Sequence, residues 1–174
     1  MEKITQLIDR ISYIFGMVAG CTMLLGVGLI VAEILVRNLL NGTLYITGEY
    51  TGYLMVSITF LGLAYTMKEK EHIRITVIHK FIKSCKKRLF IDIYANIVGL
   101  AMFLVVIIAT TNLFWNSLVT ESQSGQVSAT YLAIPQFALP LGAVLITLQF
   151  VSEIIKLILK LRRSEFSTDV IDTD

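Results

Sequence analysis

Four long stretches of the chain contain no aspartate, glutamate, lysine or arginine. They cover residues 11–32, 50–67, 93–120 and 122–152. A hydrocarbon core of about 30 Å is crossed by roughly 20 apolar residues in a helix, and each stretch supplies that length once its polar fringe is removed. A membrane barrel strand would instead alternate apolar and polar residues over about 10 positions. The pattern therefore predicts an all-α integral membrane protein.

We expect four transmembrane helices in a single membrane domain, residues 1–174. The predicted spans are residues 11–36, 46–67, 89–115 and 137–158, with the boundaries of each placed only approximately. The segments between them are too short for a separate folded domain. Hydrophobic residues make up 55% of the chain and charged residues 16%, which is too apolar for an ordinary soluble domain of this size.

The positions of the basic residues predict the orientation. Of the 15 lysines and arginines, two lie before the first span, eight lie between the second and third spans, and four lie near or beyond the end of the fourth span. Only Arg37 lies on the opposite side. Because cytoplasmic loops carry the excess of basic residues, we expect both termini and the middle loop to lie in the cytoplasm. The net charge of +2 follows from this topology, so no nucleic-acid partner is expected.

Two segments are predicted to lie on the cytoplasmic membrane surface. Residues 1–10 have the periodicity of a short N-terminal interfacial helix. An amphipathic cytoplasmic helix is expected at about residues 72–88, between the second and third spans. Its apolar and basic faces include Ile78, Phe81, Lys80, Lys83, Lys86 and Lys87. Such a helix binds anionic phospholipid headgroups, although its lysines can also be explained as charges that set the topology, and the two interpretations are compatible.

Three charged residues are expected near the outer face. Glu33 and Arg37 are four residues apart near the end of the first span, in the order that favours an ion pair. Glu49, at the start of the second span, is expected within reach of both. The group is either a docking patch for a partner or simply an interfacial ion pair beside a carboxylate at a helix N-terminus.

Other polar residues in the spans have structural interpretations. Asp92 and Glu153 are expected near the cytoplasmic ends, facing headgroup water, and Asn96 and Asn112 are expected to form hydrogen bonds between helices. No acidic residue lies at the middle of a span, which argues against a self-contained proton-coupled transporter. The Gly16-x-x-x-Gly20 spacing favours close helix packing. The fourth span is expected to begin near Pro135 and Pro140, which are tolerated in a first turn.

No pattern of catalytic or ligand-binding residues is present. The two histidines, His72 and His79, have no partners at metal-ligand spacing. Nothing matches a phosphate-binding loop, a nucleophile elbow or a catalytic triad. We therefore expect no enzyme activity, no catalytic residue, no cofactor and no metal site in this chain.

Several short sequence patterns, in order along the chain, resemble the small membrane subunit of tripartite ATP-independent periplasmic (TRAP) transporters, the DctQ-like family. They are Glu33-x-x-x-Arg37, Gly48-Glu49-Tyr50, Phe60-Leu61-Gly62-Leu63-Ala64-Tyr65, Lys68-Glu69-Lys70-Glu71-His72-Ile73-Arg74-Ile75, Ile134-Pro135 and Pro140-x-Gly142. Each is loose by itself, but the order and the predicted topology make the match more specific. Thr76 departs from the family pattern, which often has an acidic residue there, so a role for that carboxylate does not carry over.

The resemblance implies a non-catalytic scaffold subunit that pairs with a large membrane subunit of elevator type. That large subunit is expected to carry the substrate and sodium sites. A periplasmic binding protein would deliver an organic acid, either sialic acid or a C4-dicarboxylate, to the outer face. Two other classes of function remain open from the residues alone: an autonomous small four-helix exporter, and a membrane anchor or assembly subunit of another complex.

Overall fold

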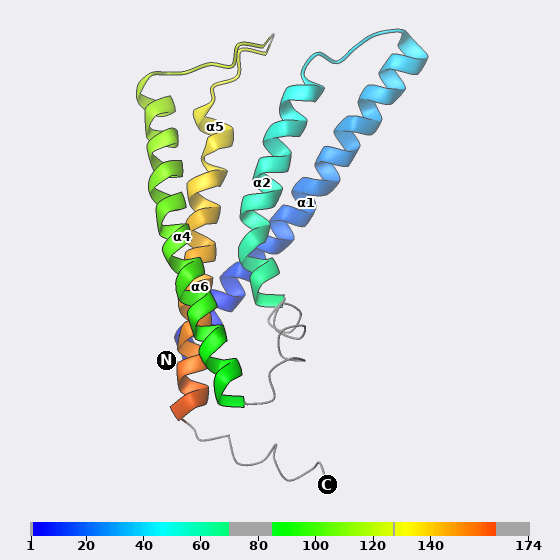
Figure 1. The fold of residues 1–174 in the computed structure, drawn as a ribbon. Helices are drawn as coiled ribbons and strands as arrows, with labels where there is room; N and C mark the ends of the chain where they lie inside the picture. Colours follow the sequence, from blue (N-terminus) through cyan, green and yellow to red (C-terminus); the bar gives the residue numbers. More distant parts are fainter. Residues whose placement is uncertain (1, 70–84, 127, 163–174) are drawn as a thin grey trace.

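In the computed structural model, the described residues 2–69, 85–126 and 128–162 form a bundle of helices without β-strands (Figure 1). The helices are α1 (Glu2–Leu40), α2 (Thr47–Glu69), α4 (Cys85–Val119), the short α5 (Ala133–Gln136) and α6 (Ala138–Arg162). The prediction of an all-α protein is confirmed. We call the end that carries residues 41–46 and 120–132 the loop end. The opposite end, where α1 begins and α6 finishes, is called the terminal end.

Three of the described helical segments are long and apolar enough to cross a membrane. They are Lys3–Leu40, Ile91–Val119 and Ala133–Leu159. They coincide with the first, third and fourth predicted spans. The second predicted span coincides with α2, which has 23 residues and is less apolar because it contains many threonine, tyrosine and glycine residues. A helix of that size is about 35 Å long, which is sufficient to cross a membrane. That α2 crosses the membrane stays a prediction.

The first helix is continuous, and the predicted short interfacial helix over residues 1–10 is not a separate element. Helix α1 runs through 39 residues without a break. The sequence explains why the helix is unbroken at its start, because no glycine or proline occurs before Gly16. The helix also has an inward face near its start, where Thr5 and Ser12 are buried. At about 58 Å, α1 is much longer than the thickness of a hydrocarbon core.

The entry into α6 follows the prediction from the two prolines. Pro135 lies in the short α5, and Pro140 lies in the first turn of α6. Neither position requires the backbone N–H that proline lacks. The amide of Phe137 donates to the carbonyl of Ala133 at 3.2 Å, so the chain continues with helical geometry from α5 into α6.

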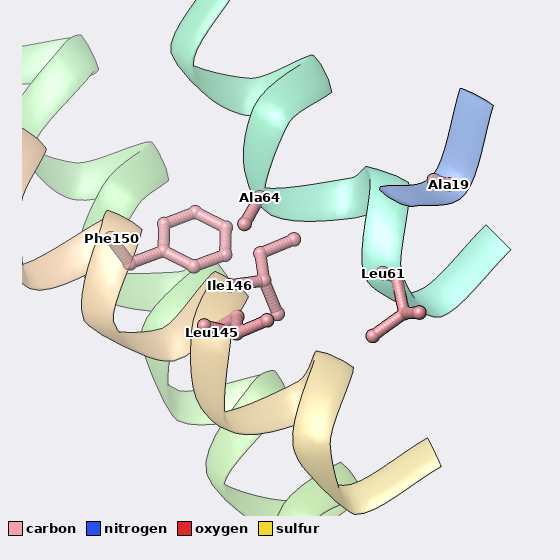
Figure 2. Packing of buried hydrophobic residues seen from close by; sticks show 6 residues of the cluster. All are labelled: Ala19, Leu61, Ala64, Leu145, Ile146 and Phe150. Atoms are coloured by element: carbon pink, nitrogen blue, oxygen red, sulfur yellow. The ribbon is translucent and has the colours of Figure 1, made fainter. Parts of the chain in front are cut away.

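Helix α6 is the central element of the bundle. In an 18-residue apolar stretch of Ala133–Leu159, 44% of the residues are buried, against 11% in the corresponding stretch of α1 and 6% in that of α4. Helix α6 packs against α4 and α2, while α1 packs mainly along α2 and diverges from α4 toward the loop end (Figure 1). Figure 2 shows the buried apolar cluster, which joins α1, α2 and α6 through Ala19, Leu61, Ala64, Leu145, Ile146 and Phe150. Helices α1 and α4 therefore leave most of their apolar surface uncovered.

Gly142 allows α2 and α6 to cross closely. A Cβ atom added to Gly142 would lie 2.4 Å from the backbone carbonyl oxygen of Phe60. Backbone atoms in a packed helix cannot move aside as the end of a flexible side chain can. The contact between the two helices at this point therefore depends on the missing side chain.

Candidate functional site

At the loop end, the Glu33 carboxylate ties the first loop and the start of α2 back to α1. Its Oε1 atom accepts a hydrogen bond from Arg37 Nη2 at 2.9 Å. Its Oε2 atom accepts from the backbone N–H of Leu44 at 2.8 Å and from the hydroxyl of Thr47 at 3.1 Å. Glu33 is 9% exposed, whereas the side chain of Arg37 is 66% exposed. The predicted Glu33–Arg37 ion pair is thus present, and most of the Arg37 side chain is exposed.

Glu49 makes its contacts with different residues. Its Oε1 atom accepts a hydrogen bond from the Tyr53 hydroxyl at 2.6 Å, and its Oε2 atom accepts one from the Ser128 hydroxyl. The Ser128 and Thr130 hydroxyls are 2.8 Å apart, and Thr130 lies 3.4 Å from the Tyr50 hydroxyl. Glu49 is only 6% exposed. Its carboxylate therefore joins the start of α2 to the loop between α4 and α5.

The three residues of the predicted outer patch belong to two clusters. Among the described residues, the structure records no hydrogen bond or ion pair that links Glu49 to Glu33 or Arg37. Each carboxylate instead fixes one of the two loops at the loop end. Of the three side chains, only that of Arg37 is largely open to an external partner.

The second loop at this end has a defined fold. Gln123 and Tyr131 form an antiparallel bridge, and the Ser124 amide donates to the Thr130 carbonyl at 2.9 Å. The Tyr131 hydroxyl donates to the carbonyl of Leu118 at 2.9 Å, which holds the second half of the loop near the end of α4. Sequence reasoning treated this segment only as a polar loop. Its series of serines and threonines was the signal for a segment that uses hydroxyls to fold.

A polar network joins α1 to α6 at the terminal end. The Ser12 hydroxyl donates to Gln149 Oε1 at 2.8 Å, and Gln149 Nε2 donates to Asp9 at 3.0 Å. Lys156 forms ion pairs with Asp9 at 3.1 Å and Glu153 at 2.7 Å. Gln149 and Ser12 are fully buried. Sequence reasoning did not identify this network, although Gln149, Glu153 and Lys156 share one face of a helix by their spacing.

Three polar residues differ from their predicted environments. Glu153 and Asp92 were expected to face headgroup water, but they are only 4% and 8% exposed. Burial of Glu153 is stabilised by the Lys156 ion pair and by Gln149 Nε2 at 3.3 Å. Asn96 was expected to bond to another helix. Its Nδ2 donates instead to the backbone carbonyl of Asp92, one turn earlier in the same helix, at 2.8 Å.

Most of the predicted amphipathic cytoplasmic helix lies outside the described residues. This applies to Ile78, Lys80, Phe81 and Lys83. Lys86 and Lys87 belong to α4, which begins at Cys85. The predicted end of a separate helix at residue 88 is therefore wrong, because residues 85–88 are part of α4. The proposed headgroup contacts stay a prediction.

The two glycines of the Gly16-x-x-x-Gly20 pattern have different surroundings. A Cβ atom on Gly16 would lie 2.5 Å from the Tyr65 side chain, so Gly16 serves packing between α1 and α2 inside this chain. Gly20 has no atom within 4 Å of the same position. It lines an open groove between α1 and α2, whose walls also include Ala19, Met23, Thr59, Gly62 and Thr66.

The polar clusters are suited to fixing helices and loops in place. Glu33 and Glu49 each accept hydrogen bonds on both carboxylate oxygens, and Glu153 lies in an ion pair. In residues 2–69, 85–126 and 128–162, no group of three histidine, cysteine, aspartate or glutamate side chains could hold a metal ion. The clusters lie near the two ends of the bundle and not at its middle.

The sequence was compared with known proteins and protein families. A family model for the DctQ component of tripartite ATP-independent periplasmic transporters matches residues 26–160. A search of curated proteins found no match. The matched region begins within α1 and includes α2, α4, α5 and nearly all of α6.

Proposed function

Because the chain belongs to the DctQ family, we propose that it is the fixed scaffold subunit of a sodium-coupled, binding-protein-dependent importer of an organic acid. The family is the small membrane component of TRAP transporters, and it is not an enzyme family. It works with a large TRAP membrane subunit and a binding protein, in the bacterial inner membrane. The specific proposals concern the scaffold role, the substrate and the docking of the binding protein.

The scaffold role is supported mainly by the uncovered apolar faces of α1 and α4. In an 18-residue apolar stretch of each helix, only 11% and 6% of the residues are buried within the chain. A large lateral surface of this kind can be covered by lipid and by a second membrane protein. The polar clusters at each end of the bundle bond internally and stabilise it, and neither cluster lies at the middle of the described helices.

Substrate and ion binding are assigned to the large subunit in this proposal. The transported compound would be sialic acid or a C4-dicarboxylate, and sodium would bind in the large subunit. The support for both is the family membership. Both termini of the small subunit would lie in the cytoplasm, since the basic residues cluster on that side. The loop end would then face the periplasm.

The scaffold proposal is tested by purification and reconstitution. The chain should co-purify with the large subunit encoded for the same transporter. Proteoliposomes with both subunits, the binding protein and a sodium gradient should accumulate the organic acid, and proteoliposomes with the small subunit alone should not. Sodium-dependent uptake by the small subunit alone would show that it is an autonomous transporter.

Arg37 is proposed as a docking contact for the binding protein. Its side chain is 66% exposed beside the buried Glu33, so it presents a positive charge at the predicted periplasmic face. We expect Arg37→Glu to reduce binding-protein-dependent uptake several-fold while the two membrane subunits still co-purify. Arg10→Glu, the same exchange at an exposed position near the opposite end of α1, is the matched control. Normal uptake by the Arg37 variant would remove this contact from the proposal.

A further inference from the structure

Asn112 is an exposed amide in the outer half of α4. Its side chain is exposed and makes no hydrogen bond with the described part of the chain. Asn96, on the same helix, differs because it bonds to the backbone of its own helix. The side-chain oxygens of Thr110 and Thr120 are likewise satisfied by backbone carbonyls one turn earlier. Asn112 therefore lacks the internal partner that these other polar residues of α4 have.

A hydrocarbon core of about 30 Å, centred on the apolar segment of α4, would include Asn112. The apolar segment Ile91–Val119 has Val105 at its centre. With a rise of about 1.5 Å per residue, Asn112 lies about 10 Å from that centre, roughly 5 Å inside the edge of a 30 Å core. Side chains lean toward the N-terminus of their helix, so the amide points toward the centre and away from the nearer surface. An amide in this place lacks water as a partner.

Asn112 lies within a continuous exposed stripe. The stripe follows the three- and four-residue steps that place side chains on one helix face: Tyr94, Val98, Ala101, Val105, Ile108, Asn112, Trp115 and Val119. Helix α1 also exposes apolar side chains, such as Leu24 at 73% and Leu25 at 69%. Exposure alone thus does not distinguish the two faces. The unpaired amide of Asn112 distinguishes the α4 face, since lipid tails offer it no hydrogen bond.

From this we infer that a transmembrane helix of the large subunit packs against the α4 stripe, and that this helix carries a hydrogen-bonding group opposite Asn112. The inference rests on the proposed scaffold function. Within a membrane, an asparagine on a helix face is satisfied by a polar group on a neighbouring helix, which also fixes the register between the two helices. Since the family works as a multi-subunit transporter, the neighbouring helix is assigned to the large subunit and not to a second copy of this chain.

The first test measures assembly of the full complex in mild detergent. We expect Asn112→Leu to weaken association with the large subunit about three- to tenfold, the range expected for one hydrogen bond between membrane helices. Asn116→Leu is the matched control. Asn116 is also exposed on α4, but it lies one turn nearer the end of the helix, beyond the edge of the core. Equal losses for both variants, or no loss for either, would overturn the inference.

The second test maps the contact with a photo-crosslinking amino acid in membranes that contain the whole transporter. Crosslinks to the large subunit are expected from Val105 and Ile108 on α4. Crosslinks from Leu24 or Leu25 on α1 without any from α4, crosslinks only between copies of this chain, or none at all would each overturn the inference. The scaffold function itself has a separate readout. Wild-type protein that fails to co-purify with the large subunit would reject both, whereas normal assembly with contacts elsewhere would reject only the α4 stripe.

Discussion

At the scale of single residues, the two loop-end carboxylates act as acceptors that gather donors from separate segments. A carboxylate has only acceptor sites and can receive several hydrogen bonds at once. Glu33 receives a guanidinium, a backbone amide and a hydroxyl, whereas Glu49 receives hydroxyls from Tyr53 and Ser128. Each carboxylate thus ties one loop to a helix, and the second loop is held in addition by the Gln123–Tyr131 bridge and by the Tyr131 bond to Leu118.

Replacement of Glu49 should loosen the second loop. Glu49→Gln replaces one of the two acceptor oxygens by an NH2 group and removes the negative charge, so the hydroxyl at that position can no longer donate there and the other bond is no longer charge-assisted. We expect amide hydrogen exchange in residues 120–132 to become several-fold faster, while the helices keep their protection. The measurement is hydrogen–deuterium exchange with mass spectrometry on the purified protein.

The control for this experiment is Glu121→Gln, the same exchange at an exposed position of the loop itself. It should leave the exchange rates of residues 120–132 unchanged. If Glu49→Gln protein keeps wild-type protection in this loop, the Ser128 contact does not determine the loop position.

At the scale of helices, the close crossing of α2 and α6 depends on a single glycine. The Gly142 position faces the backbone of Phe60, and backbone cannot give way as a side chain does. Gly16 is also confined, because a Cβ atom there would lie 2.5 Å from Cγ and 2.7 Å from Cβ of Tyr65, and rotation of the Tyr65 side chain does not move its Cβ atom. A larger residue at either glycine should therefore disturb the packing of α2.

Gly142→Ala should separate α2 from α6 and destabilise the bundle. We expect a loss of about 1–3 kcal/mol, the usual cost of forcing an extra group into a packed contact. The measurement is thermal unfolding in detergent. Gly52→Ala is the matched control on α2, because no atom lies within 4 Å of the added Cβ position. It should be neutral or stabilising by up to about 1 kcal/mol, since alanine favours a helix over glycine. Equal stability of the two variants would contradict the close crossing.

At the scale of the whole molecule, the terminal-end network closes the bundle. Helix α1 packs mainly along α2, and its beginning is joined to the end of α6 through Asp9, Gln149 and Lys156. Lys156 lies between two carboxylates, with distances of 3.1 Å to Asp9 and 2.7 Å to Glu153. Its ammonium group is a counter-charge that offsets part of the cost of burying Glu153.

Loss of that counter-charge should weaken the whole bundle. We expect Lys156→Met to lower the free energy of unfolding by about 1–3 kcal/mol, because the buried Glu153 would lose its ion pair with Lys156. The value is below that of a fully buried pair, since the Lys156 side chain is 30% exposed. Unfolding in detergent with increasing denaturant measures the change. Lys3→Met, at an exposed lysine of α1, serves as the control. A further Glu153→Gln exchange should restore part of the lost stability, and no recovery would contradict the assigned role.

Sequence patterns predicted the long apolar helices and the Glu33–Arg37 contact within α1, but not the Asn96 contact within α4 or the Glu153–Lys156 contact within α6. The stretches without charged residues predicted three segments that the structure shows to be long and apolar enough for a membrane, and the prolines marked the entry into α6. The Glu33–Arg37 pair follows from a spacing of four residues. These features are local, so hydropathy and helical periodicity determine them directly.

The partners of the polar residues were decided only by the tertiary structure. Glu49 bonds to Ser128, 79 positions away, and Ser12 bonds to Gln149, 137 positions away. Which side chains meet over such distances depends on how the helices cross, and the crossing in turn depends on contacts such as Gly142 against Phe60. The sequence by itself determined which segments are helical and apolar. Only their packing decided which buried carboxylate joins which loop, because the hydrophobic pattern orients a helix face without specifying its neighbour.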